Sequence, residues 1–165
     1  MNRIIYIMGV SGSGKTTIGR LLSYKTGIPF FDGDDFHAAA NKEKMKLGIP
    51  LTDEDRMGWL QQLHALAEQE SAGKGAIIAC SALKEKYRQL LSAHLHKPVW
   101  VFLTGSFELI QQRLKNRAGH FMPAALLQSQ FDALEIPKDV FTVQVNQGPE
   151  VITDRIWEYL KKQPC

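Results

Sequence analysis

The residues of this chain best suited to chemistry form a glycine-rich segment near its start, "GVSGSGKT", from Gly9 to Thr16. The segment matches the pattern G-x-x-x-x-G-K-[ST] and lies between a predicted strand and a predicted helix, the context that this pattern requires. Its glycines let backbone N–H groups turn toward phosphate oxygens, while Lys15 reaches the β- and γ-phosphates and Thr16 ligates Mg²⁺. The sequence therefore predicts a site for a nucleoside triphosphate and Mg²⁺, formed by Gly9, Val10, Ser11, Gly12, Ser13, Gly14, Lys15, Thr16 and Thr17.

A second group of reactive side chains occurs in "FFDGDDFH", residues 30–37. This stretch could be a metal site, a catalytic base with its support, or only an acidic helix start. It follows a predicted strand, and ligands of an open parallel sheet bind at the carboxyl ends of the strands. Asp32 and Asp34 could then both face the transferred phosphate. We expect Asp32 to support the Mg²⁺ shell through water and Asp34 to accept the proton of an acceptor hydroxyl.

The other two polar residues of this stretch are harder to assign. Asp35 fits the first turn of a helix better than it fits catalysis. His37 is equally compatible with a partly buried histidine that forms hydrogen bonds and with a contact to the substrate. A zinc site is disfavoured because no second histidine or cysteine occurs nearby at ligand spacing.

Basic residues follow at what should be the same edge of the sheet. "CSALKEKYR", residues 80–88, comes after the third predicted strand and contributes Ser81, Lys84 and Arg88, the last two four residues apart and hence on one predicted helix face. "LTDEDRMGWL", residues 51–60, adds Arg56. Cations opposite a carboxylate base suggest an acceptor with a negative group at one end and a hydroxyl at the other. Taken singly, Lys84 or Arg88 could equally be a solvated surface charge.

Short apolar runs alternate with longer helical patterns along the chain. The predicted strands are 4–8, 28–31, 76–80, 99–103 and 140–145, and the predicted helices are 15–25, 35–46, 53–72, 84–95, 106–116, 123–134 and 149–162. This order predicts an α/β fold of three layers, with a five-stranded parallel sheet and helices on both faces. We expect one domain over residues 1–165, in which "RAGHFMPA", residues 117–124, forms a mobile flap.

Composition narrows the classes of function. Lys+Arg exceed Asp+Glu by only 20 to 17, and like charges form no long run, so neither a nucleic acid nor a membrane is an expected partner. The two cysteines, Cys80 and Cys165, are not expected to form a disulfide, which suggests the cytoplasm. The N-K-x-D type of base-reading segment that a regulatory GTPase would offer is not found, so a small kinase acting on a metabolite is favoured.

With these segments in view, the chain resembles the gluconokinases of the short P-loop type, which are related to shikimate and adenylate kinases. The phosphate loop alone is shared by many NTPases, whereas the combination of D-G-D-x-x-H, C-S-A-L-K-x-x-Y-R and R-x-x-H-F-M is specific to this family. The matching segments cover most of the chain: 9–17, 30–37, 41–60, 80–88, 101–122 and 126–137. One departure is "AAA" at 38–40, where related sequences tend to have proline. It puts in question the contacts on the substrate side and leaves the expected reaction unchanged.

The resemblance implies ATP-dependent phosphorylation of D-gluconate at its 6-hydroxyl, with Mg²⁺, in a cytoplasmic homodimer. Arg113 and Arg117 become lid residues that neutralise the transferring phosphoryl group, within a lid at about 113–125. The catalytic residues would be Lys15, Asp34 and Arg117, and Asn146, in the turn after the last strand, is the candidate for the adenine. The acceptor would be bound by Asp34, His37, Arg56, Ser81, Lys84, Arg88 and His120.

Two other functions stay open at this point. One is a kinase for another small hydroxy or sugar acid, shikimate included. The other is a regulator that binds a nucleotide and transfers nothing.

Overall fold

A parallel five-stranded sheet runs through the centre of the molecule, in a computed structural model that describes residues 3–117 and 122–164. The strand order is β2-β3-β1-β4-β5, and all the pairs are parallel. The strands are β1 Arg3–Met8, β2 Phe30–Asp32, β3 Gly75–Ala79, β4 Val99–Thr104 and β5 Phe141–Gln144. Five strands were predicted from the alternation of the sequence, and the parallel sheet is confirmed.

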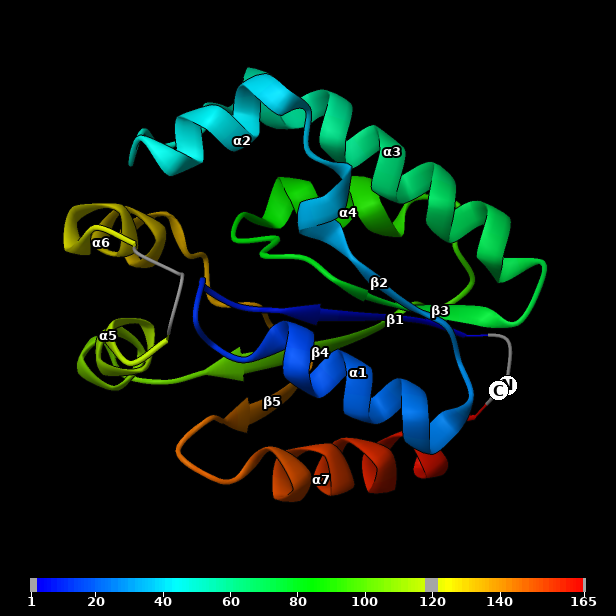
Figure 1. Cartoon of the computed structure of the whole chain (residues 1–165). Helices are drawn as coiled ribbons and strands as arrows, with labels where there is room; N and C mark the ends of the chain where they lie inside the picture. The colour runs from blue at the N-terminus through cyan, green and yellow to red at the C-terminus, as the bar shows by residue number, and fades with distance from the viewer. Residues whose placement is uncertain (1–2, 118–121, 165) are drawn as a thin grey trace.

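Helices cover both faces of this sheet (Figure 1). On β1, Ile5 and Ile7 belong to a core shared with α1 and α7, whereas Tyr6 and Met8 belong to a second core shared with α3 and α4. Alternate residues of a buried strand therefore supply two separate cores, as the two-residue period of a strand requires. The helical elements are α1 Lys15–Thr26, the 3-10 helix η1 Gly33–Phe36, α2 Ala39–Lys46, α3 Asp53–Ser71, α4 Glu85–Ser92, α5 Phe107–Lys115, α6 Ala124–Ala133 and α7 Pro149–Lys162.

Helix starts follow local capping chemistry. At α3, the Thr52 side chain accepts from the Asp55 N–H and the Asp55 side chain accepts from the Thr52 N–H, which forms a capping box. At α5, Ser106 accepts from the Leu109 N–H at 3.2 Å. At α1, by contrast, Gly14 occupies the N-cap position with φ 97 and offers no side-chain cap. The first N–H groups of α1 are therefore left available to an anion.

The single predicted helix over 35–46 is wrong. The structure has η1 at 33–36 and a separate α2 from Ala39, because His37 and Ala38 are both extended, with ψ 139 and 152. Asp32 caps η1 by accepting from the Asp34 N–H at 3.1 Å, and Asp35 lies in the first turn of η1. The polar stretch after β2 is thus a tight turn, held by a hydrogen bond to Asp32, the last residue of β2.

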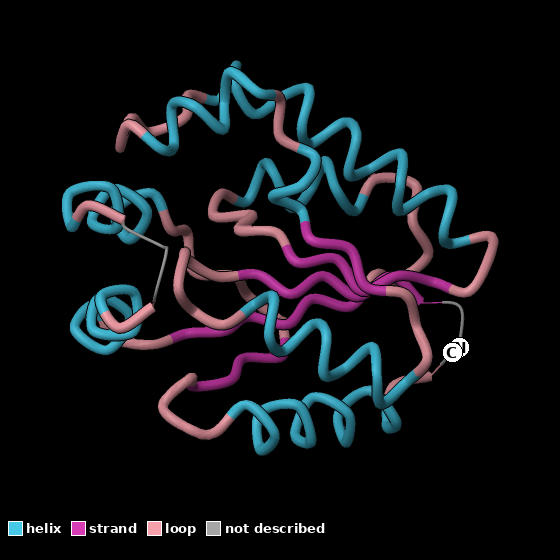
Figure 2. The backbone as a smooth tube through the Cα atoms, viewed as in Figure 1, coloured by secondary structure: helices cyan, strands magenta, loops and turns pink. Residues whose placement is uncertain are grey.

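The loops that follow the strands gather at one edge of the sheet. Figure 2 shows these loops at the carboxyl ends of the strands, and Figure 1 shows α2, α5 and α6 around the same edge. The longest helix, α3, has 19 residues, and no helix in the described part of the chain is long and apolar enough to cross a bilayer. This edge of the sheet is where functional side chains can converge.

Candidate active site

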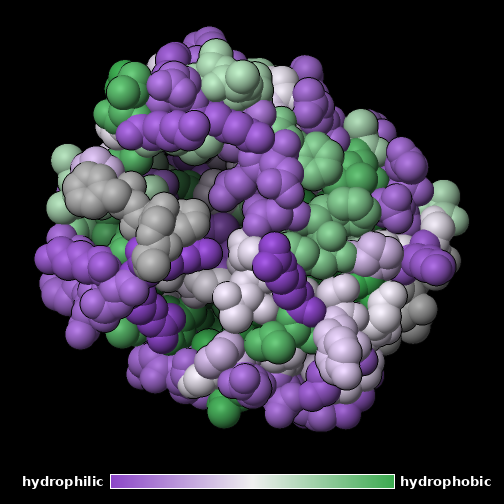
Figure 3. Space-filling view, in the orientation of Figure 1, coloured by the Kyte–Doolittle hydropathy of each residue, from purple (hydrophilic) through white to green (hydrophobic). Residues whose placement is uncertain are grey.

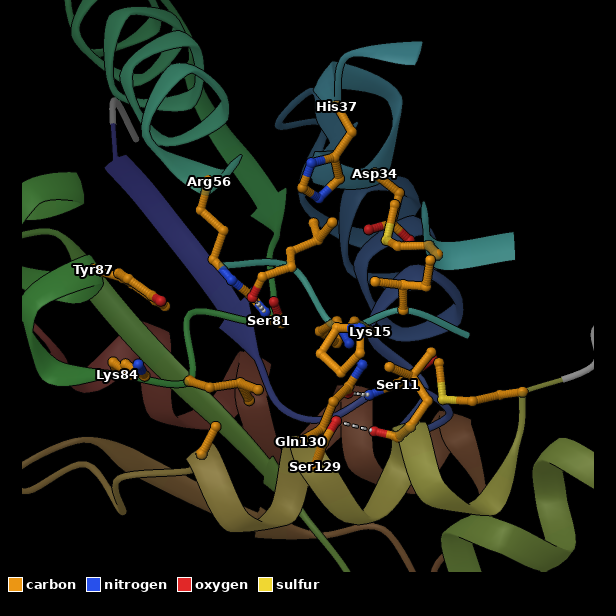
Figure 4. Close-up of a pocket in the computed structure, with 18 residues that line it drawn as sticks. Ser11, Lys15, Asp34, His37, Arg56, Ser81, Lys84, Tyr87, Ser129 and Gln130 are labelled. Atoms are coloured by element: carbon orange, nitrogen blue, oxygen red, sulfur yellow. Dashed lines mark hydrogen bonds between the residues drawn. The ribbon is translucent and has the colours of Figure 1, made fainter. Parts of the chain in front are cut away.

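A cleft opens at the carboxyl edge of the sheet, between η1 and α2 on one side and α6 on the other. We call it the central cleft. Figure 3 shows a hollow in this face beneath α2, and Figure 4 shows the side chains that line the cleft. Its polar lining is Ser11, Lys15, Asp34, His37, Arg56, Ser81, Lys84, Tyr87, Ser129 and Gln130. Residues from the phosphate loop, from the acidic turn after β2 and from the loop after β3 therefore meet in one place.

The phosphate loop surrounds the start of α1. The Lys15 ammonium donates to the backbone oxygens of Gly9 at 2.9 Å and Val10 at 3.0 Å, so it lies across the mouth of the loop. Burial lowers the pKa of Lys15, although Asp34 and Asp32 oppose this effect. A desolvated cation next to free helix N–H groups is well placed to bind phosphate oxygens.

The oxygen atoms expected to hold Mg²⁺ lie side by side. The Thr16 hydroxyl donates to Asp32 Oδ2 at 2.6 Å, and Asp32 Oδ1 accepts from the Asp34 N–H. Hydroxyl and carboxylate oxygens are the donors that Mg²⁺ prefers, and this ion usually keeps several waters and phosphate oxygens as further ligands. The pair therefore fits Mg²⁺, with Thr16 and Asp32 as its protein-side support.

Asp34 lies in the central cleft on the short helix η1. A side chain at Gly33 would place its Cβ 2.4 Å from the Ala79 oxygen of β3, so only glycine lets this turn lie against the sheet. The turn is held from the other side by Trp59, whose Nε1 donates to the Gly33 oxygen at 2.7 Å. Desolvation raises the pKa of the Asp34 carboxyl, while Lys15 lowers it. The side chain is exposed, so its candidacy for proton transfer rests on its position beside Lys15 in the cleft.

His37 is buried beside the cleft, and among the described residues its ring forms no hydrogen bond. It is buried, with 8% of its surface exposed, and it stacks on Trp59 with ring centroids 4.1 Å apart. Burial lowers its pKa to about 4, so the ring is neutral near pH 7. It also lines the central cleft, and its Nδ1 has no hydrogen-bond partner among the described residues.

Two cations lie together in the cleft around Tyr87. The guanidinium carbon of Arg56 is 5.6 Å from the Tyr87 ring centroid, and the Lys84 ammonium is 5.9 Å from it. Lys84 also donates to Asp53 at 3.2 Å, and Lys86 and Tyr87 donate to the same carboxylate. These three hydrogen bonds lower the pKa of Asp53.

Arg56 differs from Lys84 in its pairing. Its Nε is buried and has no hydrogen-bond partner among the described residues. A buried cationic donor without a partner is costly, so Arg56 is the stronger candidate of the two for an acidic group of a ligand.

Arg88 is absent from the described lining of the central cleft, where the sequence analysis expected it. Lys84 is the N-cap of α4 with ψ 146, so the two residues do not share a helix face. The Arg88 side chain is 5% exposed and donates to the oxygens of Ala82 at 2.8 Å and Leu83 at 3.1 Å, and to Glu135. Ala82 has φ 45, which is uncommon outside glycine. Arg88 thus holds the loop that carries Ser81 and Lys84 into the cleft.

A second cavity adjoins the other side of the phosphate loop. It is lined by Gly12, Ser13, Gly14, Thr17, Ile18, Arg113, Leu114, Arg117, Gln147, Pro149 and Ile152. Arg117 also lines a small hollow with Lys15, Thr16, Asp32 and Asp34. α5 ends at Lys115, so Arg117 lies beyond it, and the two arginines meet at this cavity without a shared helix face. Among the described residues Gln147 lines the cavity and its neighbour Asn146 does not. His120 lies outside the described residues.

The sequence analysis missed several residues of the cleft. Ser129 and Gln130 come from α6, and they share one helix face with Leu126 and Ala133, which also line the cleft. Their spacing of three, four and seven residues is the signal that could have found them. Tyr87, which lines the cleft, was missed together with its partner Asp53, which does not belong to the described lining. Their contact joins the starts of α3 and α4, which local spacing does not reveal.

Several known proteins are similar to this chain in sequence and in structure. A family model described as shikimate kinase matches residues 11–138. A probable gluconokinase from Mus musculus is 42% identical in an alignment that covers 96% of this chain and 97% of the relative.

Several solved structures match nearly the whole chain, and two of them also have substantial sequence identity. A sugar kinase from Janibacter sp. HTCC2649 has a TM-score of 0.89 and 42% identity, covering 98% of this chain and 96% of that one. A gluconokinase from Sinorhizobium meliloti 1021 has a TM-score of 0.83 and 37% identity, covering 98% of both chains. The fold is that of the P-loop kinases, and the chain belongs to the gluconokinase family.

Proposed function

We propose that this protein transfers the γ-phosphoryl group of ATP to the 6-hydroxyl of D-gluconate, which gives 6-phospho-D-gluconate and ADP. One observation carries the proposal. The central cleft has Lys15 and Asp34 beside the phosphate loop and Arg56 and Lys84 around Tyr87. This arrangement suits an acceptor with a hydroxyl at one end and a single carboxylate at the other.

In this proposal the carboxylate of gluconate binds Arg56 and Lys84. The Nε of Arg56 has no partner within residues 3–117 and 122–164, which supports this proposal because a carboxylate would supply an acceptor. The hydroxyl side of the acceptor then extends along Ser81 and His37 toward Asp34. His120 is retained as a further acceptor contact from the family resemblance. Arg88 acts in this scheme through the loop 81–84, as a positioning residue.

On the donor side, Gly9 to Thr17 hold the triphosphate. The N–H groups at the start of α1 and the Lys15 ammonium face its phosphates, and the cavity with Arg113, Gln147 and Pro149 accommodates the nucleoside. Asn146 stays a candidate for the adenine, and Gln147 joins it. Thr16, and Asp32 through water, would hold Mg²⁺, which would neutralise charge on the phosphates.

Positioning and charge neutralisation carry most of the acceleration in this mechanism. Lys15 and Arg117 neutralise the transferring group, and Asp34 orients the acceptor hydroxyl and takes its proton as the bond to phosphorus forms. Arg113 and Arg117 belong to the proposed lid over about 113–125. Its closure would exclude water, so that ATP is not hydrolysed without an acceptor.

A coupled assay for ADP formation tests the proposal over a panel of D-gluconate, other aldonates, shikimate and a control without acceptor. We expect kcat/KM to be highest for D-gluconate and turnover without acceptor to be low. Preference for shikimate or another hydroxy acid would favour the second kinase reading. Absence of ADP formation with every acceptor would favour a regulator that only binds nucleotides.

The family resemblance also leads us to propose a cytoplasmic homodimer that acts on a small molecule, with no nucleic-acid partner. Sedimentation velocity at micromolar protein concentration tests the oligomeric state. A single species with the mass of one chain would contradict the dimer.

A further inference from the structure

We propose that Gln130 binds the acceptor, through an amide group whose orientation is fixed by the phosphate loop. This inference rests on the proposed function and extends it to a residue of α6. Gln130 lines the central cleft together with Lys15 and Asp34, at the place where phosphoryl donor and acceptor must meet. Figure 4 shows it reaching from α6 toward the phosphate loop, beside Ser129.

The contact that fixes Gln130 is made with the backbone of the phosphate loop. The Ser11 N–H donates to Gln130 Oε1 at 2.7 Å, across 119 residues of sequence. A backbone N–H can only donate, so the amide oxygen of Gln130 must be the atom that faces it. The orientation of this side-chain amide is therefore determined by its partner.

Fixing the oxygen leaves the Nε2 group as the donor end of the side chain. The face of α6 that carries Gln130 also carries Leu126, Ser129 and Ala133 into the cleft. Two of these three neighbours are apolar, so an acceptor with several hydroxyls would find few donors along α6 other than Gln130 and Ser129. The chemistry offered by Nε2 is that of a donor to a hydroxyl or carboxylate oxygen.

The position of Ser11 makes this contact more than a surface hydrogen bond. Ser11 lines both the central cleft and the small hollow that contains Thr16, Asp32 and Arg117. Gln130 consequently connects the face of α6 that lines the central cleft to the phosphate loop. An acceptor bound to Nε2 is held in a fixed relation to the transferring group, which is what rate enhancement by positioning requires.

Two substitutions separate the donor from the acceptor function of this amide. Gln130→Glu keeps an oxygen for the Ser11 N–H and removes the donor, whereas Gln130→Met removes both at similar length. Gln128 provides the matched control, because it lies on the same helix, is exposed and hydrogen-bonds only locally, to Asp132. Gln128→Glu and Gln128→Met should behave like the unmodified protein.

Steady-state kinetics with D-gluconate and ATP give the readout, with thermal melting to check folding. We expect both Gln130 variants to raise the KM for gluconate by about tenfold, and the KM for ATP by less than about threefold, with the melting temperature retained.

Normal gluconate KM in Gln130→Glu with a raised value in Gln130→Met would reduce Gln130 to a support of the phosphate loop and overturn the inference. A rise confined to the KM for ATP would overturn it as well. Failure of the unmodified protein to phosphorylate gluconate would instead contradict the proposed function, which keeps the two failures distinct.

Discussion

At the residue scale, the polar side chains of the acidic turn after β2 make different contacts. Asp32 caps η1 and accepts from Thr16, Asp34 faces the central cleft, and His37 stacks on Trp59. Burial lowers the pKa of His37. Partial desolvation raises the pKa of Asp34, although this residue is exposed and Lys15 opposes the rise. The shift of His37 disfavours its protonated form, so the buried ring lowers the stability of the fold where the unfolded chain would bind a proton.

The relative importance of Lys15 and Asp34 follows from the mechanism. Charge neutralisation contributes more to phosphoryl transfer than proton abstraction does. In a loose transition state the bond to the leaving group is largely broken while the proton of the acceptor hydroxyl is still mostly in place. We therefore expect Lys15→Ala to lower kcat more than Asp34→Asn does, by roughly tenfold or more. Turnover numbers of the purified variants at saturating gluconate and ATP check this order. Near-normal activity of Lys15→Ala would contradict the mechanism.

A pH effect on stability follows from His37. Its pKa is about 4 in the folded protein and about 6.5 in an unfolded chain. Between these values the unfolded chain binds more protons, so the free energy of unfolding falls as the pH drops from about 6.5 to about 4. His37→Phe keeps a ring against Trp59 and cannot titrate. We expect its stability, measured by denaturant at a series of pH values, to fall less over this window. Equal losses in both proteins would contradict the assignment.

At the element scale, the strands and most helices could be predicted because their signals are local. Apolar β-branched runs mark the buried strands, and Thr52, Ser106 and Pro149 mark helix starts that the structure confirms. The break before α2 could not be predicted, because three alanines at 38–40 favour a continuous helix. At that point His37 is extended and its ring stacks on Trp59, a contact between elements that local sequence does not reveal.

The placement of Arg88 shows the same limit. Spacing suggested that it shares a helix face with Lys84, but α4 begins one residue after Lys84. The guanidinium donates to the backbone oxygens of the loop 82–83 and of Glu135. The Glu135 side chain in turn accepts from the Glu85 N–H at 2.7 Å. Such a network joins segments distant in sequence, so it is invisible to periodicity.

This network predicts a large effect of Arg88 on stability. Arg88→Met retains volume but leaves buried carbonyl oxygens unpaired, so we expect the free energy of unfolding to fall by about 2 to 4 kcal/mol. The matched control is Glu85→Gln, because the Glu85 carboxylate forms an ion pair with Arg88 at 2.7 Å. The Glu85 side chain is 55% exposed, whereas that of Arg88 is 5% exposed. It should cost less than about 1 kcal/mol. Urea denaturation measures both. Unchanged stability of Arg88→Met with a raised gluconate KM would show instead that Arg88 binds the acceptor directly.

At the scale of the whole molecule, the sheet order brings together residues that are far apart in the chain. β1 and β3 are neighbours, so the phosphate loop after β1 lies beside the loop 80–84 after β3, and Gly9 N–H donates to the Ser81 oxygen at 3.4 Å. β2 completes this edge with Asp32 and Asp34, and α6 closes the cleft from the opposite side. The fold therefore brings the proposed acceptor cleft and the proposed nucleotide cavity to one edge of the sheet.

This arrangement predicts which hydroxyl of the acceptor is phosphorylated. With the carboxylate of gluconate at Arg56, the opposite end of the gluconate molecule reaches Asp34, so phosphorylation should occur at C6. Proton–phosphorus correlation NMR of the product formed from D-gluconate and ATP measures this directly. The account predicts a phosphomonoester coupled to the C6 methylene protons, which forms only when gluconate is present. A phosphoester at another carbon, or none at all, would contradict it.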